Sequence, residues 1–297
     1  MAPPAVSVVL PAHNPTSTLA DAIASVISQS FDDWDLVVVD DGSTVDLSWV
    51  TELDPRVRVL RTEPRGVSRA RNLGTTVTDG AFVAYLDQDD VWHPSKLSRQ
   101  LSQIGDHHVL CYTAFALIDG AGTTIGPGYG RRVEYIDMLA GELGILLSSA
   151  LVRRSALEVV GLFHPLLDMQ QDLDLFLRLT QFGTSCYVES TEVEYRLHED
   201  NASRDFWRAS QELRLLLTLH ELQARDSGNS EALEAISEGR KRIRRTYAYQ
   251  AVDAARDAAH HGRMNEVPIA LLRAARLSPS VTARSMREWL SARLPAA

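Results

Sequence analysis

The chain of 297 residues is 45% hydrophobic and 23% charged, with a formal net charge of −9 at pH 7. No apolar run approaches the roughly 20 residues that a membrane-spanning helix needs, and the first residues lack the basic segment of a secretory signal peptide. The two cysteines, Cys111 and Cys186, form no short-spaced metal or redox motif, so we expect buried free thiols in a reducing cytoplasm.

Strand and helix signals alternate over residues 1–110. Short apolar runs predict four strands, at residues 6–10, 36–39, 57–60 and 81–86. Residues 19–27 have helical spacing, with Ser17 or Thr18 as the N-cap. This alternation predicts a parallel sheet covered by helices on both faces, in which ligands bind beyond the carboxyl ends of the strands. Polar side chains follow those ends, and we expect one cleft to collect Asn14, Asp40, Asp41, Asp87 and Asp89.

The rest of the chain is mixed in the middle and helical at the end. Strands are predicted at residues 109–116, 150–153 and 193–197, around a glycine-rich loop at residues 126–130. A helix is predicted from about Asp172 to Phe182, closed by Gly183. From residue 204 onward only helical signals remain: a helix to about Arg225, a turn at residues 227–230, a long helix to about His260 and two shorter ones.

Three carboxylates stand just after the apolar run at residues 81–86, in the sequence Asp87-Gln88-Asp89-Asp90. Carboxylates this close repel one another and raise each other's pKa unless a cation compensates. Mg²⁺ and Mn²⁺ prefer oxygen ligands, so Asp-x-Asp at a strand end favours a metal site that also holds phosphate oxygens. The alternative is a solvated turn that caps the helix starting near Pro94. Asp90 lies outside the Asp-x-Asp spacing, and we expect it to cap the following turn.

Seven motifs follow one another between residues 6 and 200. They are Val8-Val9-Leu10-Pro11-Ala12-His13-Asn14, Ser25-Val26-Ile27-Ser28-Gln29-Ser30, Val39-Asp40-Asp41-Gly42-Ser43-Thr44, Gly66 with Ala70-Arg71-Asn72, Leu86-Asp87-Gln88-Asp89-Asp90-Val91-Trp92, Gln171-Asp172-Leu173-Asp174-Leu175-Phe176-Leu177-Arg178-Leu179 and Tyr195-Arg196-Leu197-His198. In this order they resemble the family 2 glycosyltransferases, the GT-A-fold group that transfers a sugar from a nucleotide-diphosphate donor. The resemblance implies an α/β GT-A domain at residues 1–205, with a Rossmann-like nucleotide-binding half (1–110), an acceptor half (111–205) and a mixed central sheet. Residues 206–297 are expected to form a C-terminal helical extension.

The resemblance also places a nucleotide pocket at the strand ends. Its expected residues are Pro11, Ala12, Asn14, Asp40, Asp41, Arg71, Asp87 and Gln88. Asp41 is carried onto the nucleobase and Arg71 onto the base and phosphates. Two ordinary explanations stay open, since Asp-Gly-Ser is a common turn sequence and Arg71 could be a surface helix residue in a salt bridge.

The implied cofactor is Mn²⁺ or Mg²⁺, held by Asp89, with Asp87 shared between ribose and metal and His198 as a further contact. Bound there, the metal is a Lewis acid for the departing diphosphate. The alternative for His198 is an ordinary surface or hydrogen-bonded residue.

Asp172 is the expected general base. Direct displacement at the anomeric carbon requires an acceptor hydroxyl that loses its proton as it attacks, and one carboxylate at hydrogen-bond distance suffices. The helix dipole would stabilise the Asp172 anion, although a plain helix N-cap explains an Asp there equally well. Gln171 stands where the family usually has Glu, which leaves any role of that preceding carboxylate in doubt. Asp174 is the fallback base.

The resemblance implies an inverting, metal-dependent, non-processive glycosyltransferase that moves one sugar from a nucleotide-diphosphate sugar, with the UDP preference carried from the family, to an acceptor hydroxyl or amine. The Gln-x-x-Arg-Trp motif of processive members is absent from the sequence. Two alternatives stay open: a catalytically degenerate sugar-nucleotide-binding protein, and a sugar-phosphate nucleotidyltransferase. The second would normally have a glycine-rich loop and a lysine after the first strand, where this chain has Pro11-Ala12-His13-Asn14.

The end of the chain is basic, whereas the chain as a whole is acidic. From residue 240 onward twelve Lys and Arg stand against four acidic residues. Basic helices suit an anionic partner, a membrane surface or simply a solvated face. We therefore expect a cytoplasmic protein, with a peripheral membrane contact and a homodimer through the C-terminal helices both left open. The acceptor is a glycan, a lipid-linked intermediate or a small natural product, and no nucleic-acid partner is expected.

Overall fold

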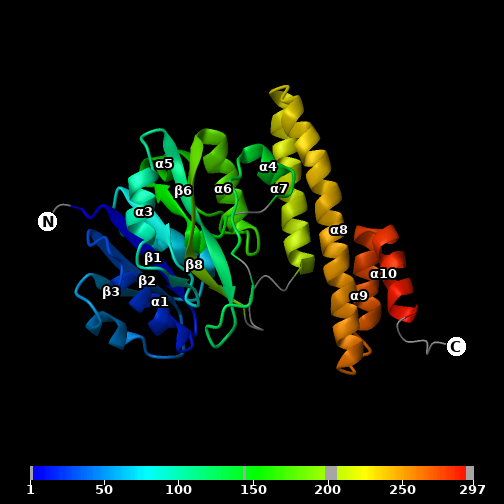
Figure 1. Cartoon of the computed structure of the whole chain (residues 1–297), viewed down its shortest axis with the longest axis horizontal. Coiled ribbons are helices and arrows are strands. Elements are labelled where there is room, and N and C mark those ends of the chain that lie inside the picture. The colour runs from blue at the N-terminus through cyan, green and yellow to red at the C-terminus, as the bar shows by residue number, and fades with distance from the viewer. Residues whose placement is uncertain (1–2, 127, 143–144, 198–205, 292–297) are drawn as a thin grey trace. The chain divides into compact units, whose positions relative to one another are not determined.

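The computed structural model describes residues 3–126, 128–142, 145–197 and 206–291 (Figure 1). The chain divides into two compact units. The first comprises residues 1–135 and 143–201, and the second comprises residues 136–142 and 202–297. The polypeptide therefore leaves the first unit at residue 135, contributes a short segment to the second, and returns before it leaves again.

Within the described residues, the first unit is built on an eight-stranded sheet in the order β3-β2-β1-β4-β7-β6-β8-β5. The strands are β1 (Val6–Ala12), β2 (Trp34–Asp41), β3 (Val57–Thr62), β4 (Phe82–Tyr85), β5 (Val91–Trp92), β6 (His108–Ile118), β7 (Leu151–Arg153) and β8 (Thr184–Arg196). Strands β3, β2, β1 and β4 run parallel, whereas β7 is antiparallel to β4 and β6, and β5 is antiparallel to β8. This mixed sheet confirms the predicted GT-A architecture.

The parallel half is held by apolar strands buried on both faces, as such sheets require. All seven residues of β1 are buried, and so are the last six of β2. Helix α1 (Thr18–Ile27) places Leu19, Ile23 and Val26 in the same core as Val8 and Val38. The other helices of this unit are α2 (Val67–Thr76), α3 (Lys96–Gln103), α5 (Arg154–Val160) and α6 (Gln171–Phe182), with 3₁₀ turns η1 (Ser48–Glu52) and η2 (Leu147–Ser149).

One local expectation is confirmed in position and another needs correction. Ser17 occupies the N-cap of α1, but its side chain makes no capping hydrogen bond, because the residue adopts helical backbone angles. Strand β8 begins at Thr184, far before the predicted residue 193. Its pairing with β6 contains register shifts, so the alternation of apolar and polar residues is broken and the pattern shows only its last part.

The second unit is helical in its described residues. Its helices are α7 (Phe206–Asp226), α8 (Ser230–His260), α9 (Val267–Leu277) and α10 (Pro279–Ser291), joined by most of α4 (Tyr135–Leu139). Asn229 caps α8 by accepting a hydrogen bond from the Ala232 N–H at 3.0 Å. Further along α8, Ala255 and Ala258 pack with Val267 and Ala270 of α9. No described helix combines the length and the apolar composition that crossing a bilayer would take.

The segment at residues 136–142 meets α8 at a glycine. A Cβ added to Gly239 would lie 2.0 Å from the Leu139 carbonyl oxygen, so only glycine permits this approach of backbone to helix. Arg242 of α8 reinforces the contact through an ion pair with Glu142 at 3.0 Å.

Gly80 makes a similar close approach where β1 and β4 start. A Cβ there would stand 2.5 Å from the backbone nitrogen of Ser7, which cannot move without disturbing the strand. We expect Gly80→Ala to lower the free energy of unfolding by about 1–3 kcal/mol, the usual range for overpacking. Urea unfolding followed by tryptophan fluorescence measures it. Gly120→Ala is the matched control, because a Cβ at Gly120 meets nothing within 4 Å. Equal stability of the two variants would contradict the packing argument.

Candidate active site

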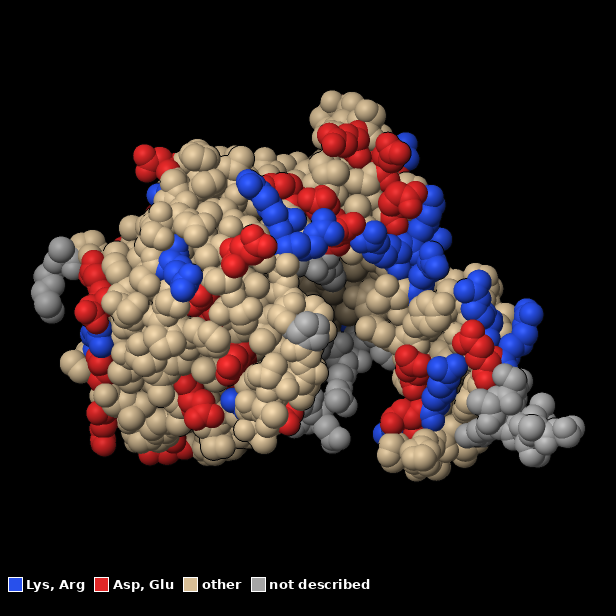
Figure 2. Space-filling view, in the orientation of Figure 1, with Lys and Arg blue, Asp and Glu red and all other residues tan. Residues whose placement is uncertain are grey.

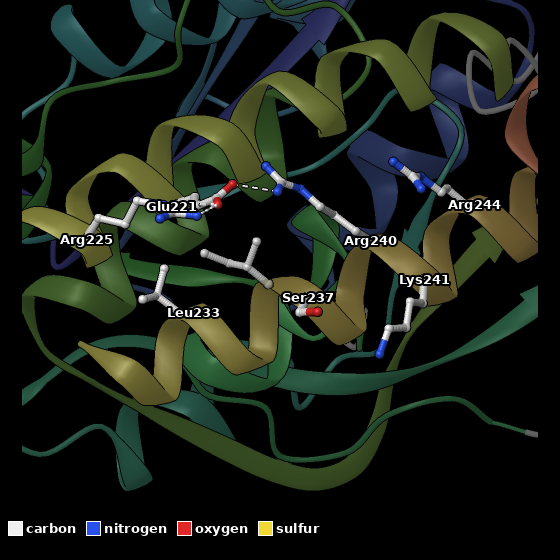
Figure 3. Close-up of a pocket in the computed structure, with 8 residues that line it drawn as sticks. Glu221, Arg225, Leu233, Ser237, Arg240, Lys241 and Arg244 are labelled. Atoms are coloured by element: carbon white, nitrogen blue, oxygen red, sulfur yellow. Dashed lines mark hydrogen bonds and ion pairs between the residues drawn. The ribbon is translucent and has the colours of Figure 1, made fainter. Parts of the chain in front are cut away.

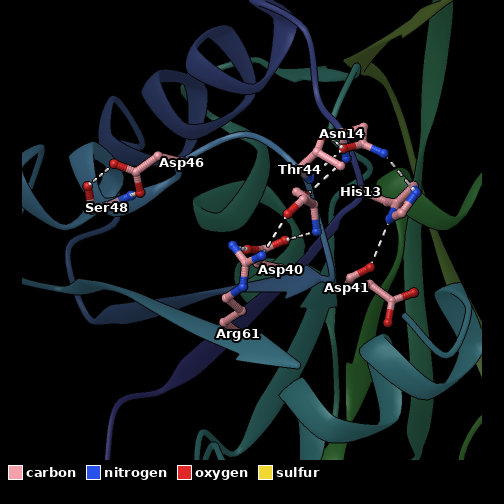
Figure 4. Close-up of polar contacts among 9 residues, drawn as sticks. His13, Asn14, Asp40, Asp41, Thr44, Asp46, Ser48 and Arg61 are labelled. Carbon is pink, nitrogen blue, oxygen red and sulfur yellow. Dashed lines mark hydrogen bonds and ion pairs between the residues drawn. The ribbon is translucent and has the colours of Figure 1, made fainter. Parts of the chain in front are cut away.

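The carboxyl end of β1 is tied to that of β2 by Asn14, which has the left-handed φ of +43°. The Asn14 N–H donates to the Ser43 hydroxyl at 3.0 Å, and the Asn14 Oδ1 accepts from the backbone N–H of Thr44 at 2.7 Å. The His13 Nδ1 contacts the Asp41 carbonyl oxygen at 2.8 Å (Figure 4). Asn14 thus fixes two turns against each other, and αL is a conformation that Asn tolerates well.

The two acids that end β2 both hold backbone. Asp40 is buried, accepts the Ser43 N–H at 2.8 Å and pairs with the Arg61 guanidinium at 3.0 Å. Asp41 accepts the N–H groups of Arg65 and Gly66, each at 2.8 Å, through its two carboxylate oxygens. Each carboxylate oxygen has a further lone pair, so these contacts leave Asp41 acceptor capacity for a ligand.

Arg71 joins the two halves of the candidate site. This residue of α2 is buried, with a side chain 3% exposed. One terminal nitrogen donates to Asp87 Oδ1 at 2.6 Å and the other donates to Asp172 Oδ1 at 3.0 Å. The guanidinium also lies 5.4 Å from the centre of the Phe163 ring. A buried cation between two carboxylates at these distances is a strongly held bridge.

Asp172 stands at the second residue of α6, where the positive end of the helix dipole favours a carboxylate. The pKa of Asp172 is raised to about 6, mainly by burial. The Arg71 guanidinium lowers this pKa and the charge of Asp87 raises it. The Asp172 side chain is still 35% exposed, and Arg71 contacts only Oδ1. Asp172 is therefore held at one oxygen and reachable at the other. The side-chain oxygen of Gln171 is buried beside it without a hydrogen-bond partner in the described structure.

The fallback base is engaged elsewhere. Asp174 forms a two-nitrogen ion pair with Arg178 at 2.7 and 3.1 Å. Arg178 also donates to the carbonyl oxygens of Val160, Gly161 and Leu162, which end α5. The Asp174 carboxylate thus stabilises the α5–α6 connection.

Asp90 is structural through long-range contacts and does not cap the next turn. It is fully buried, accepts from the Ser148 hydroxyl at 2.5 Å and from the Arg196 backbone N–H at 3.2 Å. Burial raises its pKa well above the ordinary value, and the charges of Asp87 and Asp89 raise it further. Asp90 therefore holds its proton more readily than an ordinary Asp, because it is buried beside two other acids.

Ser148 and Arg196 hold this turn from two sides, and the sequence analysis gave neither of them a role in the site. The Ser148 hydroxyl also accepts the Asp87 N–H at 3.2 Å, and the Arg196 Nε donates to the Asp89 carbonyl oxygen at 3.0 Å. Arg196 lies within the motif at residues 195–198, so the sequence could have indicated a role for it in the site. Ser148 had none, because a serine in an apolar stretch has no pattern of its own.

The structure brings most of the predicted residues to one edge of the sheet. Pro11 and Ala12 end β1 in register with Val39 and Asp40, and the Gln88 side chain accepts the His13 N–H at 3.0 Å. His198 lies outside the described residues, as does residue 127 of the glycine-rich loop. Among the residues that are described, no three side chains of His, Cys, Asp or Glu form a group able to hold a metal ion by themselves.

Comparison with known proteins places the chain among sugar-transferring enzymes. The sequence model described as Glycosyl transferase family 2 matches residues 7–161. A Rickettsia felis protein named as an uncharacterized glycosyltransferase is 27% identical over 74% of this chain, which spans 39% of that protein's length. Bacillus subtilis TuaG, named for teichuronic acid biosynthesis, is 29% identical over 70% of this chain and 84% of its own length.

Two solved structures share the fold. Residues 1–349 of Staphylococcus aureus TarS in complex with UDP-GlcNAc superpose with a TM-score of 0.60 at 15% identity, covering 91% of each chain. The Pyrobaculum calidifontis mannosyltransferase PcManGT in complex with GDP-Man and Mn²⁺ gives a TM-score of 0.62 at 15% identity, covering 99% of this chain and 82% of its own.

The Ser148 network gives a stability test of the turn. Ser148→Ala removes the hydroxyl that donates to buried Asp90, and we expect a loss of about 1–3 kcal/mol in the free energy of unfolding. Ser149→Ala is the matched control, since that hydroxyl is equally buried but donates only to the Leu146 carbonyl oxygen. Chemical unfolding of both variants measures the difference. Equal losses would mean that the bond to Asp90 contributes nothing beyond an ordinary buried hydroxyl.

Proposed function

The chain belongs to glycosyltransferase family 2, and we propose that it is an inverting, metal-dependent, non-processive enzyme that moves one sugar from a UDP-sugar to an acceptor hydroxyl or amine. The observation that carries the proposal is the bridge from Asp87 through Arg71 to Asp172. It connects a carboxylate of the Asp-x-Asp turn with a separate, partly exposed carboxylate whose pKa suits a general base.

The acids of the turn fit a divalent cation. Mg²⁺ is usually bound through one or two carboxylates together with substrate phosphates, and Asp87 and Asp89 supply two such side chains. Burial is the main cause of the raised pKa of Asp90, and the charges of Asp87 and Asp89 raise it further, so a cation bound at this turn would ease the repulsion among the three acids. We assign the metal to Asp89 and Asp87, with His198 as a third ligand. Bound there, a metal would stabilise the negative charge of the departing diphosphate.

Asp172 is proposed to remove the acceptor proton. The acceptor oxygen forms its bond to the anomeric carbon as the bond from that carbon to the diphosphate oxygen breaks, and the electron pair leaves with the nucleoside diphosphate. The proton goes to Asp172 Oδ2, the oxygen that Arg71 does not contact. Attack from the side opposite the leaving group inverts the anomeric centre.

The donor side is assigned to the nucleotide-binding half at residues 1–110. Pro11, Ala12 and Asn14 would shape the pocket, Asp41 would face the base, and Gln88 already links the two turns that border it. The UDP preference is supported by the UDP-GlcNAc bound to TarS, although PcManGT binds GDP-Man. The shared element of both donors is a nucleoside diphosphate.

The acceptor half is assigned to residues 111–205. The proposed acceptor is the one predicted from the sequence: a glycan, a lipid-linked intermediate or a small natural product. A peripheral membrane contact, a homodimer through the C-terminal helices and a cytoplasmic location remain predictions.

Substitution of two acids, Asp172 and Asp89, separates the two sides of the reaction. Asp172→Asn is expected to lower kcat by about 10²–10⁴-fold, the usual contribution of a general base, with donor affinity nearly unchanged. Asp89→Asn is expected instead to weaken the Mn²⁺-dependent binding of UDP. Release of UDP from UDP-sugars and calorimetric titration with UDP and Mn²⁺ measure the two effects.

Asp174→Asn is the matched control for the base, because it removes a carboxylate two residues away that pairs with Arg178. We expect it to lower stability and to keep turnover within a few-fold of wild type. Near wild-type turnover in Asp172→Asn would refute the base assignment. No metal-dependent nucleotide binding by the wild-type protein would refute the proposed function as a whole.

The pKa of Asp172 also predicts a pH dependence. The base works only when ionised, so kcat/KM should fall as the pH drops below about 6, the folded-state pKa of this carboxyl. An ordinary Asp would keep activity down to about pH 4. A pH–rate profile with saturating metal measures this fall in kcat/KM at acidic pH. The residual activity of Asp172→Asn should not show the same fall. A wild-type profile flat from pH 7 to about 4.5 would contradict the assignment.

A further inference from the structure

We propose that a basic groove on the α7–α8 hairpin binds a phosphate group of an anionic ligand, as a site separate from the candidate donor site. The groove lies between the two helices and has a volume of about 400 Å³. Its lining consists of Glu221 and Arg225 of α7 and Leu233, Ile236, Ser237, Arg240, Lys241 and Arg244 of α8 (Figure 3). A cavity of this size falls in the range of small-ligand sites.

The wall of the groove is an ordered cluster of charges. The Glu221 carboxylate pairs with Arg240 at 2.5 Å and with Arg225 at 2.7 Å. Hydrogen bonds from these two guanidinium groups lower the pKa of Glu221. Arg240 also donates to the Thr218 hydroxyl at 3.2 Å. One carboxylate therefore fixes two guanidinium groups, one from each helix, in defined positions beside the cavity.

The remaining cations are not matched by acids inside the groove. Lys241 pairs with Glu238 at 2.7 Å, but both side chains are more than 60% exposed, so water screens the pair. In the described part of the chain, no carboxylate lies within 4.0 Å of the Arg244 guanidinium. The lining thus has four cations against one anion, and its net positive charge calls for an anionic ligand.

Within the described residues, neither Lys241 nor Arg244 forms an ion pair between the two helices, whereas Arg240 pairs with Glu221 of α7. Both helices of the hairpin also contribute buried apolar residues, such as Leu213 and Leu217 of α7 and Ile236 of α8. Residues 240–245 contain five Lys or Arg, which include like-charge neighbours three and four residues apart, a destabilising arrangement on a helix. Figure 2 shows Lys and Arg gathered over α8 in that view. Binding of an anion would reduce the repulsion among these like charges on α8.

Phosphate is the anion that this set of donors fits. A guanidinium donates two parallel N–H bonds to phosphate oxygens, and Lys241 adds a point charge. The Ser237 hydroxyl stands among them as a further donor, while Leu233 and Ile236 give the floor an apolar part. A neutral sugar would bring no counter-charge to Arg244 or to the net positive lining. The ligand is therefore a phosphate or diphosphate group, free in solution or on a lipid headgroup.

The test compares a groove variant with a charge-matched control. Lys241→Gln with Arg244→Gln removes two exposed cations and leaves the Glu221 pairs intact. Arg284→Gln with Arg287→Gln removes two exposed cations from α10, in the same unit. Two probes distinguish the sources: inorganic pyrophosphate, titrated calorimetrically with EDTA present, and sedimentation with vesicles of phosphatidylglycerol and phosphatidylcholine against vesicles of phosphatidylcholine alone. Circular dichroism checks that each variant keeps its helix content.

We expect the groove variant to bind one of the probes about tenfold more weakly than wild type, as loss of charged hydrogen bonds implies, and the α10 variant to bind it as wild type does. Loss in the pyrophosphate arm identifies a soluble phosphate ligand, and loss confined to the phosphatidylglycerol vesicles identifies a lipid headgroup. If pyrophosphate bound only at the donor site, the groove variant would bind it with the same affinity as wild type. Equal binding by all three proteins, equal loss in both variants, or no binding of either probe by the wild type would overturn the proposal.

Discussion

The buried guanidinium of Arg71 is the interaction on which the candidate site depends. It belongs to α2, yet it contacts carboxylates that follow β4 and begin α6, at 2.6 and 3.0 Å. Without it, Asp87 and Asp172 would face each other as two partly buried anions, and removal of one partner from a buried charge cluster is strongly destabilising. The bridge therefore both positions Asp172 and makes its ionised form tolerable.

The frame around that bridge is made of backbone contacts contributed by distant residues. Asp40 and Asp41 hold turns after β2, while Ser148 and the backbone of Arg196 hold Asp90 below the Asp-x-Asp turn. Of these acids, Asp40 and Asp41 are the ones that the sequence motifs predict as ligand contacts. Their geometry shows that a carboxylate at a strand end can hold a turn and still keep lone pairs for a ligand, because backbone N–H groups occupy only part of its acceptor capacity.

The sequence predicted the parallel half of the sheet well because β1 and β2 each contain a continuous apolar run and the helical spacing of α1 separates them. It predicted less of β8, whose register shifts break the alternation. In the candidate site, motifs placed Asp87, Asp172 and Arg71 in the chain but not their direct contact, which depends on how α2 and α6 pack. Ser148 was out of reach for the same reason, since its role comes from tertiary neighbours and not from its own segment.

The helical unit depends on a segment from the middle of the chain, which packs against α8. Residues 136–142 come from the middle of the sequence, yet Leu139 approaches α8 so closely that Gly239 has no room for a side chain. Arg242, one of the cations in the basic stretch of α8, is committed to Glu142 of that segment. The cations of residues 240–245 therefore do not act alike: Arg240 orders the groove, Arg242 ties the returning segment, and Lys241 and Arg244 stay exposed. Within two turns of one helix, Arg240 and Arg242 form ion pairs that hold the structure. The neighbouring Lys241 and Arg244 are exposed, so their charges stay available to a ligand.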